Sequence, residues 1–430
     1  MNSLKIFIKD LRDFLILWLS QSFSSLGSAM TNFALVIWSY QQYGSALQTA
    51  LLAICSYAPY VLMSIFAGAL SDRWNKKLTM LLCDSFAAGC TVIVLILLQS
   101  DKLELWHLYC LNALNGLMNT VQQPSADVTT SLLTPKKYYQ KVSGMRSFSN
   151  SLVSVITPVL ATALLSLFSV QIVIAFDLFS FGVAFISLLF FIKIPELKRE
   201  DSVKEPILKA AKAGLVYLRQ NRGILDLILF LAAINLIASV YNAAFPAMVL
   251  SRQGGGEVAL GIVNAAVGIA TLAGSVIVSL LPAPKSRVRV ICDTLLISMS
   301  TENFFLAFGQ SIPLWCIGAV LGWITIPVMG ANMDVLFRSR IPIEMQGRVY
   351  SARNTLQFFT IPIGYFLGGI LVDKVFEPFM ETQGADSFLT VVFGSGKGSG
   401  AALLFLILAF AGIFVCLFFR KDKYIWQLEE

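Results

Sequence analysis

The stretch Gly68-Ala-Leu-Ser-Asp72-Arg73-Trp-Asn75-Lys76-Lys77 lies between two long apolar runs and decides the fold. A helix that leaves a bilayer tolerates a carboxylate such as Asp72 only where its charge meets water or a partner. The three cations that follow mark the exit as cytoplasmic, because short cytoplasmic loops are enriched in lysine and arginine. The stretch therefore predicts a turn at the inner face of a membrane.

The composition indicates a membrane protein with many spans. Of the 430 residues, 57% are hydrophobic and only 13% are charged, and the mean hydropathy is +0.74. A soluble surface typically requires about 25% charged residues, so we predict an all-α polytopic membrane protein. The net charge of +7 is spread over short loops instead of forming one basic patch, which argues against a nucleic-acid partner.

Residues that usually carry metal binding or catalysis are sparse. The seven cysteines form no CxxC pair and most lie inside apolar runs, so they predict neither a disulfide framework nor a metal site. The only histidine, His107, falls near the outer end of a predicted helix, and no nucleophile and base pair or ATP-binding motif is visible. We therefore expect neither an enzyme nor a bound cofactor.

Twelve apolar stretches are long enough to cross a bilayer, which requires about 20 residues. They predict two six-helix bundles, at 1–193 and 224–430, joined by a cytoplasmic linker at 194–223. The linker mixes apolar residues with cations, which favours an amphipathic helix on the inner leaflet, and a plain solvated linker fits equally well. An extracellular loop is expected at 374–398. The predicted spans are 12–40, 46–71, 77–99, 104–130, 139–167, 170–193, 224–251, 257–282, 288–309, 312–337, 345–373 and 399–420.

The loop cations also predict the orientation of the chain. They recur at the termini and on alternate turns, for example from Lys5 to Arg12, from Lys136 to Lys141 and from Arg420 to Lys423. The positive-inside rule then places both termini in the cytoplasm. We expect a multi-pass protein of the cell membrane.

The two halves of the chain resemble each other. Leu15-Ile-Leu-Trp-Leu19 aligns with Leu227-Ile-Leu-Phe-Leu231 at an offset of 212 (227 − 15), and Cys83-Asp84-Ser85 aligns with Cys292-Asp293-Thr294 at 209 (292 − 83). A slowly drifting offset predicts the parallel internal repeat of many transporters. The two aspartates therefore occupy matched positions, where we expect them to brace the adjacent loops. Ser147, Asn150, Leu152 and Pro158 extend the match to Ser351, Asn354, Leu356 and Pro362 at an offset of 204.

With two six-helix halves, a basic linker and the stretch from Gly68 to Lys77, the chain resembles the major facilitator superfamily along its whole length. Asn75 stands where the family has a second glycine, and asparagine tolerates a left-handed backbone better than most residues. The segments 18–29, 213–219 and 346–349 resemble the macrolide-efflux-like branch of drug exporters. This resemblance implies proton-coupled efflux of a hydrophobic, macrolide-like drug by alternating access, as in a multidrug antiporter that gives antibiotic resistance, with the proton gradient as energy source.

Two departures from the family pattern leave the route of the proton open. Asn115 stands where many drug:proton antiporters carry an arginine, and Thr157-Pro158 is a reduced form of the glycine-proline signature of the fifth helix. The alternatives are export of a native metabolite such as a siderophore or a lipid, and a transporter-like receptor that does not pump.

The resemblance also implies a conformational gate in which Asp72 contacts the start of the eleventh helix. Two arginines near that helix start are candidates for a charge-assisted contact with Asp72. The predicted gate consists of Gly68, Asp72, Arg73, Lys76, Lys77, Arg348 and Arg353.

Three carboxylates are candidates for proton or cation coupling. Glu302 lies well inside the ninth helix, and its repeat position falls on the apolar Ile93 (302 − 209 = 93). It is expected to carry a proton or meet a cationic substrate, or else to hydrogen-bond a neighbour. Asp127 and Asp334 lie near the ends of helices four and ten at an offset of 207 (334 − 127). They are interpreted either as paired gate residues or as end charges that pair with nearby cations such as Lys137.

Amide and aromatic side chains form the predicted substrate cavity. Such a surface suits a large, mostly apolar molecule with scattered polar groups, and the alternative is that the amides hold helices together. We expect an amphipathic or hydrophobic small-molecule substrate, contact with membrane lipids and a monomer. The cavity residues are Gln21, Asn32, Asn115, Asn119, Gln122, Asn235, Tyr241, Asn242 and Asn332.

Overall fold

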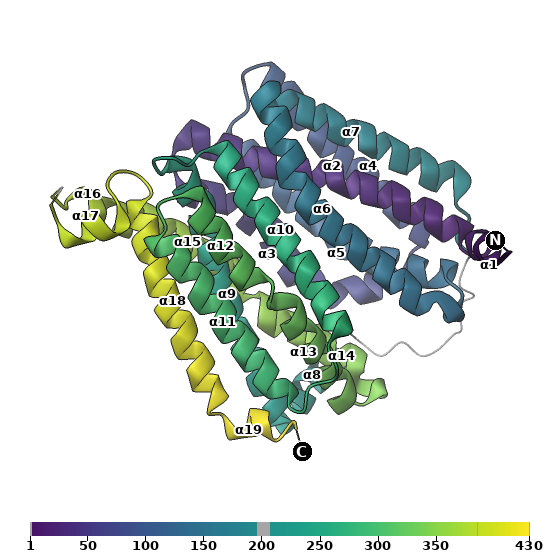
Figure 1. The fold of residues 1–430 in the computed structure, drawn as a ribbon. Coiled ribbons are helices and arrows are strands. Elements are labelled where there is room, and N and C mark those ends of the chain that lie inside the picture. Colours follow the sequence, from purple (N-terminus) through teal and green to yellow (C-terminus); the bar gives the residue numbers. More distant parts are fainter. Residues whose placement is uncertain (1, 196–206, 385, 430) are drawn as a thin grey trace. The chain divides into compact units, whose positions relative to one another are not determined.

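Helices account for nearly all of the chain (Figure 1). The computed structural model describes residues 2–195, 207–384 and 386–429, with the backbone alone described for 64–73 and a few shorter stretches. Within these ranges no strand occurs. The prediction of an all-α fold is confirmed.

The first half of the chain forms seven α-helices and two short segments. The 3-10 segment η1 and the π-helical η2 extend α6 and α7 at one end each. The elements are α1 (Asn2–Asp10), α2 (Arg12–Tyr43), α3 (Ala46–Arg73), α4 (Lys76–Gln99), α5 (Leu105–Leu133), η1 (Lys136–Tyr138), α6 (Tyr139–Leu167), α7 (Val170–Ile186) and η2 (Ser187–Phe191).

The second half repeats this pattern with more interruptions. A helix in the linker region precedes the bundle, and short helices follow the π-helical η3. The elements are α8 (Ile207–Gln220), α9 (Arg222–Ser251), α10 (Glu257–Leu280), α11 (Arg287–Phe308), α12 (Ile312–Trp323), α13 (Ile326–Arg340), α14 (Ile343–Phe358), α15 (Thr360–Ile370), η3 (Leu371–Phe376), α16 (Glu377–Glu381), α17 (Phe388–Phe393), α18 (Ser399–Arg420) and α19 (Lys423–Trp426).

Ten helical segments in the described part of the chain are long and apolar enough to cross a membrane. The helices α2 and α5, with 32 and 29 residues, complete the twelve predicted spans but are less apolar. Both carry several of the amides predicted for the cavity. A helix that turns its polar side to other helices and away from lipid can hold such amides by interhelical hydrogen bonds.

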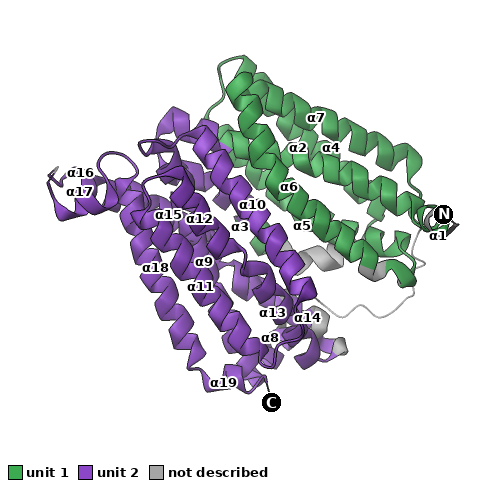
Figure 2. Ribbon diagram, viewed as in Figure 1, with its two compact units in different colours: residues 1–35, 58–207 green, residues 36–57, 208–430 purple. Residues whose placement is uncertain are grey.

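The chain divides into two compact units (Figure 2). Unit 1 contains residues 1–35 and 58–207, and unit 2 contains residues 36–57 and 208–430. The segment 36–57, which holds the ends of α2 and α3 and the turn between them, thus packs with the second half of the chain. The sequence repeat alone gives no sign of this exchange.

The turn after α3 differs from the one expected. Asn75 has an extended backbone (φ −65°, ψ 119°), and its side chain accepts a hydrogen bond from the Leu78 backbone N–H at 3.1 Å. The expectation of a left-handed asparagine is therefore wrong. Asparagine is favoured here because it is among the best helix N-caps, and it starts α4.

The tenth and eleventh predicted spans are both interrupted. The tenth consists of α12 and α13, separated at 324–325, and Pro327 lies in the first turn of α13. Proline lacks a backbone N–H, but the N–H groups of a first helical turn have no partner within the helix, so Pro327 is suited to start a new helix here. The Thr325 hydroxyl donates to the Thr294 carbonyl of α11 at 3.2 Å, which fixes the break against its neighbour.

Candidate functional site: buried carboxyl groups in each unit

Glu302 is a buried carboxyl group within α11. The Tyr241 hydroxyl donates to Glu302 Oε1 at 2.6 Å, and the Trp323 indole Nε1 donates to the same oxygen at 2.8 Å. The residue is only 4% exposed. The sequence predicts Glu302 for coupling and Tyr241 for the cavity, and the structure places the two side chains in direct contact.

Two neighbouring helices fix the donors around Glu302. Tyr241 lies on α9, where its ring stacks on Phe245 with centroids 5.4 Å apart. Trp323 is the last residue of α12, and Gly322 before it allows a close approach to α11. A Cβ added at Gly322 would lie 2.7 Å from Glu302 Cβ and 2.8 Å from Oε2. The site therefore depends on a glycine at this position.

The electrostatic setting of Glu302 is unusual for a membrane protein. Within the described residues, neither lysine nor arginine contacts its carboxyl group, and the two donors are neutral. An uncompensated carboxylate in hydrocarbon costs at least about 2.5–3.5 kcal/mol. Binding a proton or a cation removes this cost, so the group is suited to exchange one or the other.

The break in the tenth span lies beside this carboxyl group. Trp323 both ends α12 and binds Glu302, and Gly274 of α10 packs against the backbone of Ile324 at the break. Interrupted helices in transporters often mark the sites where substrates or coupling ions bind. The sequence predicts an unbroken helix here, so it gives no signal for the role of Trp323.

Unit 1 contains a second carboxyl group held by neutral donors. Gln21 Nε2 of α2 donates to Asp84 Oδ2 at 3.2 Å, and Gln122 Nε2 of α5 donates to Asp84 Oδ1. Both glutamines are predicted cavity residues, and Asp84 brings them together. Its repeat counterpart Asp293 instead forms an ion pair with Arg420 at 2.7 Å. The matched aspartates therefore differ in what neutralises them.

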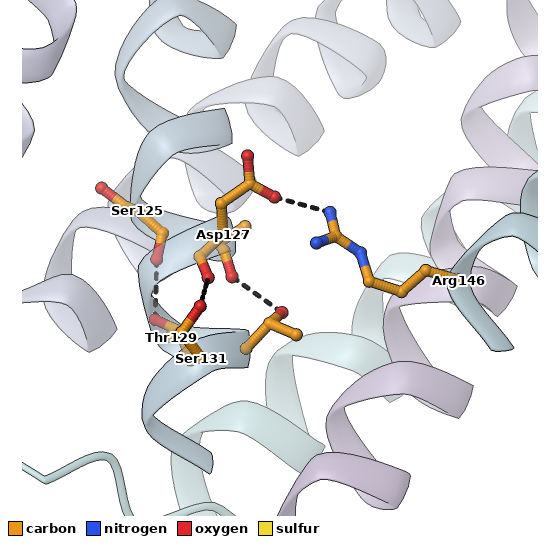
Figure 3. Close-up of polar contacts among 7 residues, drawn as sticks. Ser125, Asp127, Thr129, Ser131 and Arg146 are labelled. Atoms are coloured by element: carbon orange, nitrogen blue, oxygen red, sulfur yellow. Dashed lines mark hydrogen bonds and ion pairs between the residues drawn. The ribbon is translucent and has the colours of Figure 1, made fainter. Parts of the chain in front are cut away.

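Asp127 also finds its partner within unit 1 (Figure 3). Arg146 Nη2 of α6 lies 2.6 Å from Asp127 Oδ1 of α5, with side chains 45% and 52% exposed. The sequence offers Lys137 as a partner, but Lys137 pairs with Asp10 at 2.7 Å. The pKa of Asp10 is lowered by this hydrogen bond to Lys137. Lys137 is thus already engaged, and Arg146 takes its place.

A polar pocket of about 320 Å³ lies beside the Asp127 and Arg146 pair. The Ser131 hydroxyl donates to the Asp127 carbonyl at 3.0 Å (Figure 3). Such donations within α5 leave hydroxyl lone pairs as acceptors in the wall of the pocket. The lining residues are Thr130, Ser131, Thr134, Val142, Ser143, Arg146, Ser147 and Asn150.

Unit 2 repeats the acid and the arginine at the same spacing. Asp334 and Arg353 follow Asp127 and Arg146 by 207 residues each (334 − 127 = 353 − 146). Asp334 interacts electrostatically with Arg353. The Arg353 guanidinium lies 4.6 Å from the Phe337 ring centroid, and its Nε donates a hydrogen bond to the side chain of a nearby glutamine at 3.0 Å. The equal offsets are visible in the sequence, and would have identified Arg146 as the partner.

The other predicted cavity amides differ in their local contacts within each unit. Asn235 Nδ2 donates to the Gln357 carbonyl at 3.1 Å, and Asn332 Oδ1 accepts from Arg287 Nη1 at 3.1 Å. These two serve interhelical contacts. The Oδ1 atom of Asn115 is buried without a described hydrogen-bond partner. Asn32, Asn119 and Asn242 are exposed.

The predicted gate is described only in part. The side chains of Asp72 and Arg73 lie outside the described residues, and only the backbone is described for Gly68. Lys77 Nζ donates to the carbonyls of Leu189 and Ile192 at 2.9 and 2.8 Å, at the end of η2, where carbonyls at a helix end attract a cation.

The remaining gate residues lie in separate settings. Lys76 is buried. Arg353 has the contacts given above, and the backbone of Arg348 packs against Gly214 of α8. The gate stays a prediction.

Two units with matched carboxylates, long apolar helices and an interrupted helix beside a buried acid define a membrane transporter built from an internal repeat. The family model for the Major Facilitator Superfamily matches residues 17–364. The chain belongs to this superfamily, as its loop after α3 predicts. It is therefore a multi-pass membrane protein whose relatives are transporters.

Individual relatives narrow the comparison. The chain is 24% identical to macrolide efflux protein A of Streptococcus pyogenes over 84% of its own length and 90% of that protein. It is 22% identical to the uncharacterized MFS-type transporter YfiS of Bacillus subtilis, over 86% and 89%. A solved POT family transporter in complex with 5-aminolevulinic acid is 11% identical, with a TM-score of 0.73 and coverage of 97% of both chains, and this likeness supports the fold alone.

Proposed function

We propose that the protein exports a hydrophobic, macrolide-like compound in exchange for protons by alternating access. The observation that carries the coupling is the Glu302 carboxyl group, buried at a helix break and held by two neutral donors. The class of cargo rests on the similarity to macrolide efflux protein A. The protein works as a monomer among lipids in the cell membrane, with both termini in the cytoplasm.

In the proposed cycle Glu302 binds a proton from one side of the membrane and releases it on the other. When the carboxyl group loses its proton, its charge must be solvated or paired, so the contacts with Tyr241 and Trp323 change in strength. These two residues lie on α9 and at the break of the tenth span. Proton binding thereby biases which conformation of unit 2 is populated.

Transport in inverted membrane vesicles tests the proposal. Uptake of a radiolabelled macrolide should follow the proton gradient and collapse when a protonophore is added. In Glu302→Gln we expect gradient-driven uptake to be lost while macrolide binding persists. Asp177→Asn is the matched control, because Asp177 is also a buried acid but is held by Ser28 at 3.0 Å in unit 1.

The outcomes of this experiment separate the alternatives. Uptake that ignores the protonophore would refute proton coupling. No uptake of any macrolide, with uptake of a siderophore or a lipid from the same panel, would replace the cargo and leave the coupling intact. Binding without uptake of any compound would favour a receptor. Loss of uptake in Asp177→Asn equal to that in Glu302→Gln would remove the specific role of Glu302.

A second experiment addresses the gate. We propose that Asp72 closes the cytoplasmic side through a charge-assisted contact with Arg348 or Arg353. Asp72→Asn should then impair uptake while the protein is still produced and inserted. Full uptake in that variant would refute the gate.

A further inference from the structure

The hairpin formed by residues 36–57 belongs to unit 2, although both of its helices continue into unit 1 (Figure 2). The helix α2 runs without interruption from Arg12 to Tyr43 and therefore crosses between units at 35–36. The helix α3 crosses back at 57–58. The chain thus connects the units through two helices whose ends are docked on unit 2.

One carboxylate holds the turn of this hairpin. Asp373 of η3 accepts hydrogen bonds from the Ser45 hydroxyl at 2.5 Å, and from the backbone N–H groups of Ala46 and Leu47 at 2.9 Å each. These amides are the unpaired donors at the start of α3. A carboxylate at a helix N-terminus is stabilised by the hydrogen bonds and by the helix dipole. Asp373 therefore caps α3 from a distant part of the chain.

Other contacts surround the cap. The Tyr40 hydroxyl donates to Ser251 Oγ of α9 at 3.2 Å, and the Gln41 amide donates to Glu257 of α10. These hydrogen bonds accompany apolar packing, in which the Tyr57 ring of the hairpin stacks on Tyr365 with centroids 6.4 Å apart. Polar groups of this kind exchange their partners for water at a small net cost, since a hydrogen bond contributes only about 0.5–1.5 kcal/mol. The polar part of this contact is therefore suited to repeated opening.

Two features allow the hairpin to dock and to leave. Gly369 of α15 lies against the Leu47 backbone so closely that an added Cβ would overlap it. Pro59 lies inside α3, two residues after the crossing at 57–58. Proline removes a helical hydrogen bond and permits a bend there. The helix α2 has no proline at its own crossing.

We propose that Asp373 is a positioning residue for transport, which holds the hairpin 36–57 on unit 2 until the units move. Because α2 is continuous across the boundary, a movement of unit 1 carries the hairpin with it and breaks the three bonds to Asp373. The helix α3 follows by bending at Pro59. This role rests on the alternating access proposed above and needs no assumption about the cargo.

Hydrogen–deuterium exchange of the purified full-length protein tests the docking. In Asp373→Ala we expect the amides of residues 45–49 to exchange at least about tenfold faster, which corresponds to about 1.4 kcal/mol of local opening. Asp373→Asn keeps one acceptor and should show a smaller increase. Gly369→Ala should also accelerate exchange without touching Asp373. Glu381→Ala is the control, because this acid is exposed on the neighbouring α16.

Some exchange results would overturn the proposal. Exchange in Asp373→Ala that matches Glu381→Ala would show that the cap does not hold the hairpin. Equal acceleration in α4, which lies in unit 1, would show a general loss of stability instead of undocking. Acceleration confined to the hairpin in both Asp373→Ala and Gly369→Ala supports the docking.

A reversible lock tests the role in transport. Gln41→Cys and Glu257→Cys leave Asp373 in place and lie at a second contact of the hairpin with unit 2. They are combined in a chain whose seven native cysteines are replaced, and a short, reducible bifunctional thiol reagent links them. Uptake of radiolabelled macrolide should fall at least about tenfold and return after reduction. Unchanged uptake in the linked protein would refute the positioning role. If the wild type transports no macrolide, the proposed cargo fails, and the exchange experiment still decides the docking.

Discussion

The two halves keep acids at matched positions but neutralise them differently. Asp84 in unit 1 is held by two amides, whereas its counterpart Asp293 in unit 2 is paired with Arg420. Asp127 forms a close ion pair with Arg146, whereas the matched arginine of unit 2 lies over an aromatic ring. The repeat therefore preserves the positions of the acids more strictly than the groups that neutralise them.

Glu302 has no acidic counterpart in the other half of the chain. Its repeat position in unit 1 is the apolar Ile93, so no symmetric bracing role explains a carboxyl group there. It is also more deeply buried than Asp84, which is only half-buried. We therefore expect residues with a specific role in transport at positions where the two halves of the chain differ.

The largest expected effect comes from neutralising Glu302 and Asp84 separately. Glu302→Gln should reduce gradient-driven uptake roughly 100-fold, or about 2.7 kcal/mol, on the scale of an intramembrane charge. Asp84→Asn should retain dependence on the proton gradient and change mainly the affinity, because Gln21 and Gln122 lose their common acceptor. Uptake measured against external pH separates the two. Loss of the pH dependence in Asp84→Asn instead would exchange the two roles.

A smaller effect is expected from substitutions at Gly322 and Asn115. These two residues occupy equivalent positions of the repeat at the offset of 207 (322 − 207 = 115). Gly322→Ala places a methyl group against Glu302 and should destabilise the protein by about 1–3 kcal/mol. Asn115→Leu removes a buried acceptor without a described partner and should leave stability unchanged or increase it. Thermal unfolding in detergent measures both, and equal destabilisation would contradict the comparison.

The sequence predicts the fold well because long apolar helices and loop cations are local properties. The twelve predicted spans follow from apolar stretches along the chain, the repeat follows from the aligned halves, and the stretch from Gly68 to Lys77 contributes to the recognition of the family. The symmetry argument also singles out Glu302. These features depend on composition and spacing and not on the partner of any one side chain.

The partners of these residues could not be predicted in the same way. Trp323 reaches Glu302 because α12 ends there, and Asp373 reaches Ser45 across 328 positions of the chain. Neither contact has a local pattern. The assignment of 36–57 to unit 2 is also a packing result, since this segment is continuous in sequence with unit 1.

A modest effect is expected from the ion pairs themselves. The Asp293 and Arg420 side chains are 40% and 39% exposed, and exposed pairs contribute about 0–1 kcal/mol. Asp293→Asn and Asp127→Asn should therefore each lower stability by less than about 1 kcal/mol, and added salt should shrink the difference from the wild type. A larger loss of stability in Asp293→Asn that does not change with salt would contradict this expectation. It would indicate that unit 2 depends on its ion pair for stability and that unit 1 does not.

The smallest effect concerns the exposed pair of Asp10 and Lys137 in unit 1. The hydrogen bond from Lys137 lowers the pKa of Asp10 below its ordinary value of 3.8, and the same bond raises the pKa of Lys137. A lowered carboxyl pKa in the folded state means that the stabilisation is present above the unfolded value and is lost as the pH falls through the folded pKa. Lys137→Ala should raise the pKa of Asp10 toward 3.8, as measured by NMR titration of labelled aspartate. The same variant should leave uptake near neutral pH unchanged, because Asp10 stays ionised there; a change in uptake would show that this end of unit 1 takes part in the cycle.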